Sequence, residues 1–224
     1  KRLYIGGYYA VGLDAASGTY EPVDPGHGDP WIPDAVLWEF DTETWALSSG
    51  ELVSVDRQIR DIALSPVDSR VYIATIGEVP SDGSRSRLEV FDTASHTTIA
   101  DVPVEGLWDL FITDHLAVSL DGSRIYLGSG EVIDTATYEI IEDRLEGYGS
   151  SVILSPDGER LYFARSYEGH ITVVDAETGT EVGSYPGLGW AFGLATSDNK
   201  SGPLYGLMDG GAAPQPNSNA GSGP

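Results

Sequence analysis

The chain has 224 residues, of which 41% are apolar, and its 35 acidic against 12 basic side chains give a formal net charge of −23. This composition suffices for a folded all-β domain with a sizeable core, and the absence of cysteine excludes disulfides, thiolate metal sites, iron–sulfur clusters and covalent haem attachment. The acidic surface repels phosphate backbones and anionic lipid headgroups, and no stretch approaches the roughly 18 apolar residues of a membrane helix, so neither nucleic-acid partners nor membrane insertion are expected.

The first predicted strands lie near the start of the chain. Residues 2–6, Arg-Leu-Tyr-Ile-Gly, and residues 38–40, Trp-Glu-Phe, are short runs rich in aliphatic and aromatic side chains, as strands are. Asp41 follows the second run, where its carboxylate can accept hydrogen bonds from the next amides in an Asx-type turn. These runs are predicted to be the second and third strands of a unit that lacks its first strand.

Residues 7–35 interrupt this unit and are the least repeat-like part of the sequence. They hold three aspartates around a histidine, a loose oxygen-rich arrangement of the kind that hard cations bind. The arrangement predicts a calcium site at Asp24, Asp29 and Asp34, and the alternative is a Pro/Gly-rich loop with solvated carboxylates. Apart from calcium, the sequence indicates no cofactor.

Aromatic side chains of the same insert predict a binding surface. Tyr8, Tyr9 and Trp31 offer rigid apolar area, and His27 adds a polar anchor, a combination suited to a carbohydrate or a protein. The alternative is that these aromatics pack onto their own unit, as those of long loops often do.

Three further copies of one pattern follow, beginning at residues 64, 118 and 154. Each copy has a serine, a turn containing aspartate, a run such as Arg-Leu-Tyr-Phe-Ala, and then a second run that ends in an aspartate turn. Gly-containing turns between short apolar runs indicate antiparallel strands, and a fourth strand follows the aspartate, as at residues 181–185. Tyr72, Tyr126 and Tyr162 are predicted to occupy equivalent positions on the second strands.

The spacing of the repeated aspartates predicts the fold. Asp41, Asp92, Asp134 and Asp175 lie 51, 42 and 41 residues apart, and periods of this length with four short strands are typical of β-propeller blades. We therefore expect an all-β fold, a β-propeller of four-stranded antiparallel blades, with about four blades and a partial one over residues 1–211. The blade boundaries are predicted near residues 64, 118, 154 and 196.

The end of the sequence departs from the repeat. Residues 192–197 and 203–207 are predicted to be the first two strands of the partial blade, and residues 212–224 form a Gly/Pro/Ser/Asn-rich tail or linker. Two arrangements stay open. Either the remaining blades lie outside this chain, or the strand near Phe192 joins the strand near Leu3 and closes a small ring.

A second, smaller insert over residues 76–87 indicates which face of the disc carries function. Like residues 7–35, it falls between the second and third strands of its blade. Such connections emerge from one side of a propeller, and insertions in repeat proteins gather on the face that binds. The predicted binding face is therefore the one that carries both inserts.

The predicted inner strands carry polar residues at one shared position. Asp61, His115 and Ser151 each lie four residues before the serine of their repeat, so their side chains are expected to line the central channel. Asp61 and His115 are candidate ligand- or partner-binding residues, and the alternative is that they bond across the channel with water. His96 and His170 are predicted to lie in solvated turns.

The clearest copy of the pattern has a family resemblance. Residues 155–162, Ser-Pro-Asp-Gly-Glu-Arg-Leu-Tyr, and residues 173–179, Val-Val-Asp-Ala-Glu-Thr-Gly, resemble the YVTN β-propeller repeat of surface-layer-type proteins. That repeat is related to the propellers of quinoprotein amine dehydrogenases and of lactonase-like proteins. In the dehydrogenases the propeller is largely a scaffold with the quinone on another chain, so the resemblance implies no catalytic residue here.

The leading functional interpretation is a noncatalytic, extracytoplasmic β-propeller that binds a protein or a glycan, or builds an assembly by self-association. It would be extracellular, on the cell surface or periplasmic. The sequence has no Gly-x-Ser-x-Gly elbow, phosphate-binding glycine loop or His-Glu-x-x-His motif. The alternative is a scaffold subunit of a quinoprotein-dehydrogenase-like enzyme, or a lactonase-like hydrolase.

Overall fold

The structure is a computed structural model that describes residues 2–7, 11–14, 19–22, 35–44, 46–55, 57–77, 86–104, 115–142, 145–165, 168–186, 190–196 and 204–209. These residues form strands and turns, and among them there is no helix that is long and apolar enough to cross a membrane. The predicted tail over residues 212–224 lies outside the described residues.

The strands form a series of antiparallel sheets, which we call blades. Blade 1 contains β1 (Arg2–Gly7), β4 (Ala35–Asp41) and β5 (Ala46–Val55). Blade 2 contains β6 (Arg57–Leu64), β7 (Arg70–Gly77), β8 (Ser86–Asp92) and β9 (Thr97–Val104). Blade 3 contains β10 (Leu116–Val118), β11 (Arg124–Leu127), β12 (Val132–Asp134) and β13 (Ile140–Glu142). Blade 4 contains β14 (Ser151–Leu154), β15 (Arg160–Arg165), β16 (His170–Asp175) and β17 (Glu181–Tyr185).

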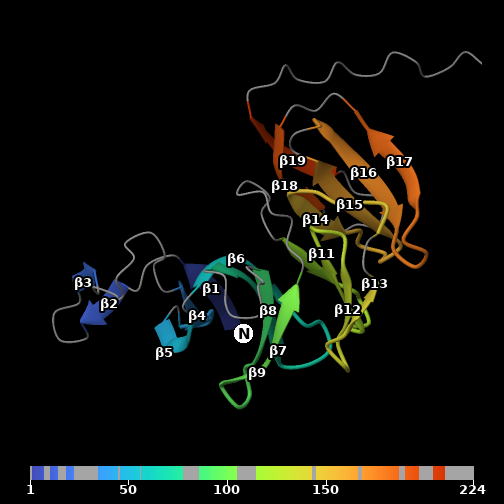
Figure 1. Cartoon of the computed structure of the whole chain (residues 1–224). Helices are drawn as coiled ribbons and strands as arrows, with labels where there is room; N and C mark the ends of the chain where they lie inside the picture. The colour runs from blue at the N-terminus through green and yellow to red at the C-terminus, as the bar shows by residue number, and fades with distance from the viewer. Residues whose placement is uncertain are drawn as a thin grey trace, which may run out of the picture.

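The last strands, β18 (Trp190–Thr196) and β19 (Leu204–Asp209), pair with each other and form a partial blade. The blades follow one another in chain order along an open arc, with blade 1 and the β18–β19 pair at its two ends (Figure 1). The first strands β6, β10, β14 and β18 contact one another in turn, as inner strands of a propeller do. In this structure the strand near Phe192 and the strand near Leu3 lie in different sheets, since β18 pairs with β19 and β1 belongs to the β1–β4–β5 sheet.

The repeat is read correctly from the sequence. Each second strand opens with an arginine whose Cα partner is the aspartate that ends the third strand, for example Arg160 opposite Asp175. Tyr72, Tyr126 and Tyr162 lie two residues after these arginines, so their equivalence is confirmed. The aspartates also close the turns as predicted, since Asp175 accepts hydrogen bonds from the next amides, those of residues 177 and 178.

Both inserts span fewer residues than predicted. Gly7 pairs with Val36, so the first insert begins after β1 and ends before β4, and it contains a hairpin of β2 (Val11–Asp14) and β3 (Thr19–Pro22). The second insert was placed over residues 76–87, but Ile76 pairs with Ser86 in the β7–β8 ladder. Both ladders therefore continue into the segments that were predicted to be inserts.

The core lies between blades. Successive side chains of a strand point to opposite faces, so each middle strand packs against two neighbouring blades. On β7, Val71 and Ile73 belong to a cluster with Leu37 of blade 1, whereas Tyr72 belongs to a cluster with Ile125 of blade 3. A third cluster joins blades 3 and 4. The fold is therefore a partial β-propeller, stabilised mainly by contacts between consecutive blades.

Two equivalent tyrosines differ in their hydroxyl groups, which gives a first prediction. The Tyr126 hydroxyl donates a hydrogen bond to the carbonyl of Ala176 at 3.3 Å. The Tyr72 hydroxyl is buried without a hydrogen bond of normal geometry, although the Arg70 guanidinium is nearby. We expect Tyr126→Phe to lower the free energy of unfolding by about 1 kcal/mol, and Tyr72→Phe to change it by less than about 0.5 kcal/mol. Urea denaturation of both variants checks this, and equal losses would contradict it.

Candidate functional site

The inner strands bring together two of the residues that the sequence singled out. Asp61 lies on β6 of blade 2, and His115 immediately precedes β10 of blade 3. Because the two inner strands contact each other and the residues occupy the same repeat position, their side chains meet across the blade boundary. The third residue of the series, Ser151, is only 3% exposed and is not presented to solvent.

The contact between Asp61 and His115 is a defined polar pair. Asp61 Oδ2 lies 3.1 Å from His115 Nδ1 and accepts a hydrogen bond from the Leu116 amide at 3.0 Å, while Oδ1 accepts one from the Ile62 amide at 2.9 Å. Both side chains are 27% exposed. In the neutral imidazole, Nδ1–H donates to Asp61, which leaves Nε2 as an acceptor.

A second polar group lies in blade 4, at the end of the blade where the chain passes from its second strand, β15, to its third strand, β16. The Arg165 guanidinium stacks over the Tyr148 ring, with 3.9 Å between Cζ and the ring centroid. It also contacts Glu168 at 3.1 Å and His170 Nε2 at 3.4 Å. The prediction that His170 lies in a turn is wrong, because His170 pairs with Arg165 at the start of β16. His96 does lie in a turn and has a positive φ of 56°.

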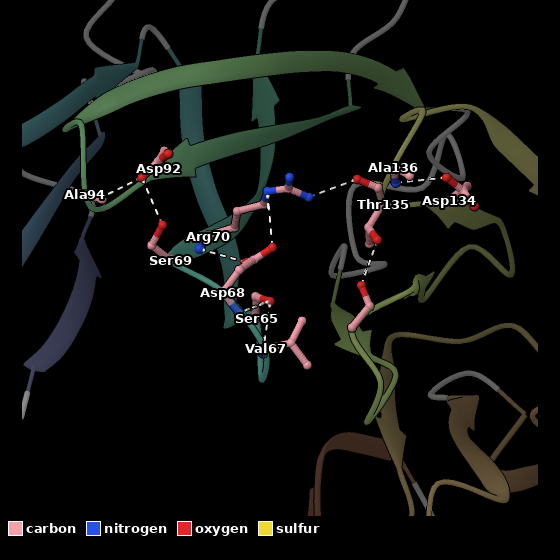
Figure 2. Close-up of polar contacts among 11 residues, drawn as sticks. Ser65, Val67, Asp68, Ser69, Arg70, Asp92, Ala94, Asp134, Thr135 and Ala136 are labelled. Atoms are coloured by element: carbon pink, nitrogen blue, oxygen red, sulfur yellow. Dashed lines mark hydrogen bonds and ion pairs between the residues drawn. The ribbon is translucent and has the colours of Figure 1, made fainter.

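The opposite ends of blades 2 and 3 are tied by an arginine that the sequence analysis did not single out. Arg70 Nη1 donates to the Thr135 carbonyl at 3.0 Å, and its Nε lies 3.4 Å from Asp68 Oδ2 (Figure 2). The Thr135 hydroxyl donates to the carbonyl of Gly122 at 2.7 Å. Arginine also begins the second strands of blades 1, 3 and 4, and this recurrence is a feature of the sequence from which a role could have been inferred.

The turns at this end hold ionised carboxylates. Hydrogen bonds from the amides of the following residues lower the pKa of Asp41, Asp92, Asp134 and Asp175. The Ser119 hydroxyl, with Ser123, lowers the pKa of Asp121 from 3.8 to about 2. These carboxylates stabilise their own turns and, in the described part of the chain, form no group of three or more side chains that could hold a metal.

The low pKa of Asp121 gives a second prediction. A depressed folded-state pKa stabilises the protein fully above the unfolded value of 3.8, and this contribution is lost as the pH falls toward about 2. We therefore expect Asp121→Ala to lower the melting temperature at pH 6, and this difference from the parent chain to shrink below pH 4 and to be lost as the pH falls through about 2. Thermal melts across this range check it, and a difference independent of pH would contradict it.

The remaining predicted site residues are outside the described residues. They are Tyr8, Tyr9, His27 and Trp31 of the aromatic surface and Asp24, Asp29 and Asp34 of the calcium site. The aromatic surface and the calcium site therefore stay predictions.

Comparison with known proteins supports the propeller fold. No family model matches the chain. Over 123 residues it is 33% identical to the seven-bladed beta-propeller protein Rv1057 of Mycobacterium tuberculosis, an alignment that covers 54% of this chain. The match spans only 30% of the length of that relative.

Solved structures give the same result. Kuenenia stuttgartiensis hydrazine synthase superposes with a TM-score of 0.56 at 20% identity, over 67% of this chain and 42% of that one. U3-55K superposes with a TM-score of 0.50 at 14% identity, over 62% of this chain and 43% of that one. At these identities the likeness shows the fold alone, a β-propeller, and leaves function to the residues of this chain.

Proposed function

We propose that the chain is a module of a noncatalytic, extracytoplasmic β-propeller of the YVTN type, which binds a protein or a glycan, or builds an assembly. The binding face in this proposal is the one that carries the two inserts. In this proposal the first insert binds calcium at Asp24, Asp29 and Asp34, because carboxylate oxygens are the ligands that this cation prefers.

The proposal rests on one observation. The two connections between second and third strands that are longer than those of blades 3 and 4 leave their blades on the same face. The first insert joins β1 to β4, the second joins β7 to β8, and both pairs are second and third strands of antiparallel blades. The Tyr148–Arg165 stack lies at the equivalent end of blade 4. An aromatic ring beside a guanidinium provides stacking area and hydrogen-bond donors, which suit glycan and protein surfaces.

Deletion of residues 14–34 tests this proposal. The strands of blade 1 lie outside the deletion, so the melting temperature should stay within a few degrees of that of the parent chain. Binding on a glycan array, and chemical crosslinking to proteins of the source cell's envelope, should be lost. Leu120→Ser, in a turn at the opposite end of blade 3, is the control that should keep binding. Binding retained by the deletion variant but lost by the control would overturn the choice of face.

A lactonase-like hydrolase is the second candidate, because the Asp61–His115 pair is an arrangement that can perform acid–base chemistry. A carboxylate that orients an imidazole leaves Nε2 as a general base. This candidate predicts that the chain hydrolyses simple lactones and that His115→Gln lowers the rate at least 100-fold. Absence of hydrolysis in the parent chain would leave the binding or scaffold function.

A further inference from the structure

The outer strands of blades 2, 3 and 4 share an irregularity at one position. In β9, β13 and β17 the ladder with the third strand skips one residue, which makes a β-bulge, and the skipped residues are Ile99, Ile141 and Val182. Each of them lies seven residues after the aspartate that ends the third strand of its blade. The bulge is therefore part of the repeat in these three blades.

The skipped residues are large aliphatic side chains that the fold leaves exposed, and we call them the outer-strand row. Ile99, Ile141 and Val182 are 44%, 49% and 48% exposed, and the core clusters of the described residues do not include them. Ile141 belongs to blade 3, which has a complete four-stranded blade on each side, so its exposure does not come from an end of the arc. The exposure of the row is therefore a property of the outer strands themselves.

The bulge by itself does not require an aliphatic side chain. In blade 1 the equivalent residue is Ser48, which the β4–β5 ladder skips between the Phe40–Leu47 and Glu39–Ser49 pairs. A polar residue at this position leaves no apolar area in water, and a charged one opposes unwanted pairing at the edge of the sheet. Aliphatic residues at the same bulge in three consecutive blades therefore indicate a surface that contacts a partner.

Carboxylates flank the outer-strand row. Each member of the row has an exposed acidic residue within two positions along its strand, namely Asp101, Glu142 and Glu181. The strands β9, β13 and β17 contain no lysine or arginine, and Arg87 of the adjacent strand β8 is ion-paired with Asp101. A partner must therefore combine apolar side chains with positive charge. A second copy of this chain, with its net charge of −23, would be repelled.

We propose that the outer-strand row is a docking surface for a segment of another polypeptide in which lysines or arginines alternate with aliphatic or aromatic side chains. The apolar side chains of this segment pack on the row, and its cationic groups lie beside the flanking carboxylates. Because each bulge distorts its edge strand, the segment docks through side chains and does not extend the sheets as a further strand. This surface lies on the outer strands and is separate from the face that carries the inserts.

A synthetic peptide with this chemistry tests the proposal. We expect a fluorescein-labelled peptide made of two copies of Leu-Lys-Lys-Leu-Leu-Lys-Leu to bind the chain saturably in an anisotropy titration. The triple variant Ile99→Thr, Ile141→Thr, Val182→Thr should weaken this binding at least about tenfold, because it removes apolar area from all three contacts. Threonine keeps the β-branched shape of the original side chains, so the melting temperature should stay within a few degrees of that of the parent chain.

The matched control is the triple variant Leu64→Thr, Val67→Thr, Leu120→Thr. It removes three exposed aliphatic side chains that lie at the ends of inner strands or in the turns after them, and it should bind the peptide as the parent chain does. A peptide with serine in place of every leucine should bind more weakly, and equally to the parent chain and to the outer-strand variant. Equal affinity of the leucine peptide for the two triple variants, or no saturable binding to the parent chain, would overturn the proposal.

Photocrosslinking locates the peptide without any variant. A leucine peptide that carries a benzophenone group should label β9, β13 and β17 of the parent chain, as peptide mapping by mass spectrometry would show, and labelling confined to other strands would contradict the proposal. A dimer in sedimentation analysis that only the outer-strand variant dissociates would assign the row to a second copy of this chain instead. Deletion of residues 14–34 should leave peptide binding unchanged, so this inference and the proposed function can fail separately.

Discussion

Gly149→Ala should lower the free energy of unfolding by about 3 kcal/mol, because the backbone of blade 4 leaves no room for a methyl group. A Cβ at this position would collide with the carbonyl oxygen of Ala164 and lie 2.7 Å from its carbonyl carbon. That carbonyl also accepts hydrogen bonds from the amide and the hydroxyl of Ser150 at 2.8 and 3.1 Å. The strand would have to move, and both hydrogen bonds would weaken.

Gly183→Ala is the matched control for this substitution. Gly183 lies on the outer strand β17, and a Cβ there would meet no atom within 4 Å. We expect a change of less than about 0.5 kcal/mol, or a slight gain, since alanine loses less conformational entropy than glycine on folding. Urea denaturation followed by tryptophan fluorescence measures both variants. Equal losses of unfolding free energy in the two variants would contradict a steric clash between a side chain at position 149 and the Ala164 carbonyl.

Phe163→Ala should lower the free energy of unfolding by about 3–5 kcal/mol, because its ring is fully buried between blades 3 and 4. The ring also packs closely over Gly147, where a Cβ would lie 2.5 Å from Phe163 Cδ2. Gly147→Ala alone should therefore cost about 1–3 kcal/mol. In the Phe163→Ala background both ring contacts are removed and the contact with Val174 Cγ2 at 2.6 Å remains, so the second substitution should cost about 1 kcal/mol less.

The double-mutant cycle distinguishes this contact from two independent defects. Free energies of unfolding from urea titrations of the parent chain, both single variants and the double variant give the coupling between the two positions. Additivity within about 0.3 kcal/mol would contradict direct packing of Phe163 on Gly147. Tyr185→Ala, at a side chain that is 54% exposed on the outer strand of blade 4, is the control and should cost far less than Phe163→Ala.

Most of the architecture was predictable because the repeat is local. A turn serine and a closing aspartate recur in the repeats, and each accepts hydrogen bonds from amides of its own hairpin. Arg160 N donates to Ser155 Oγ at 2.9 Å, and Thr178 N donates to Asp175 Oδ1 at the same distance. Interactions over such short sequence separations follow from residue order alone.

The contacts between blades were harder to predict. The repeat pattern placed Asp61 and His115 at equivalent positions of their blades, but it did not predict that their side chains pair. Their 3.1 Å contact depends on how the two inner strands are placed relative to each other. It missed the role of Arg70 for the same reason, since the Thr135 carbonyl belongs to another blade. It also missed Gly147 and Gly149, whose need for glycine arises only when their loop packs on blade 4.

The sequence by itself determined the all-β class, the repeat of four-stranded blades and the exclusion of cysteine chemistry, because strand periodicity and turn residues act within one hairpin. The tertiary structure decided which side chains meet across blades, and that β18 lies in a sheet with β19 and not with β1. These features depend on the relative placement of strands that are distant in sequence, and side-chain period alone does not fix that placement.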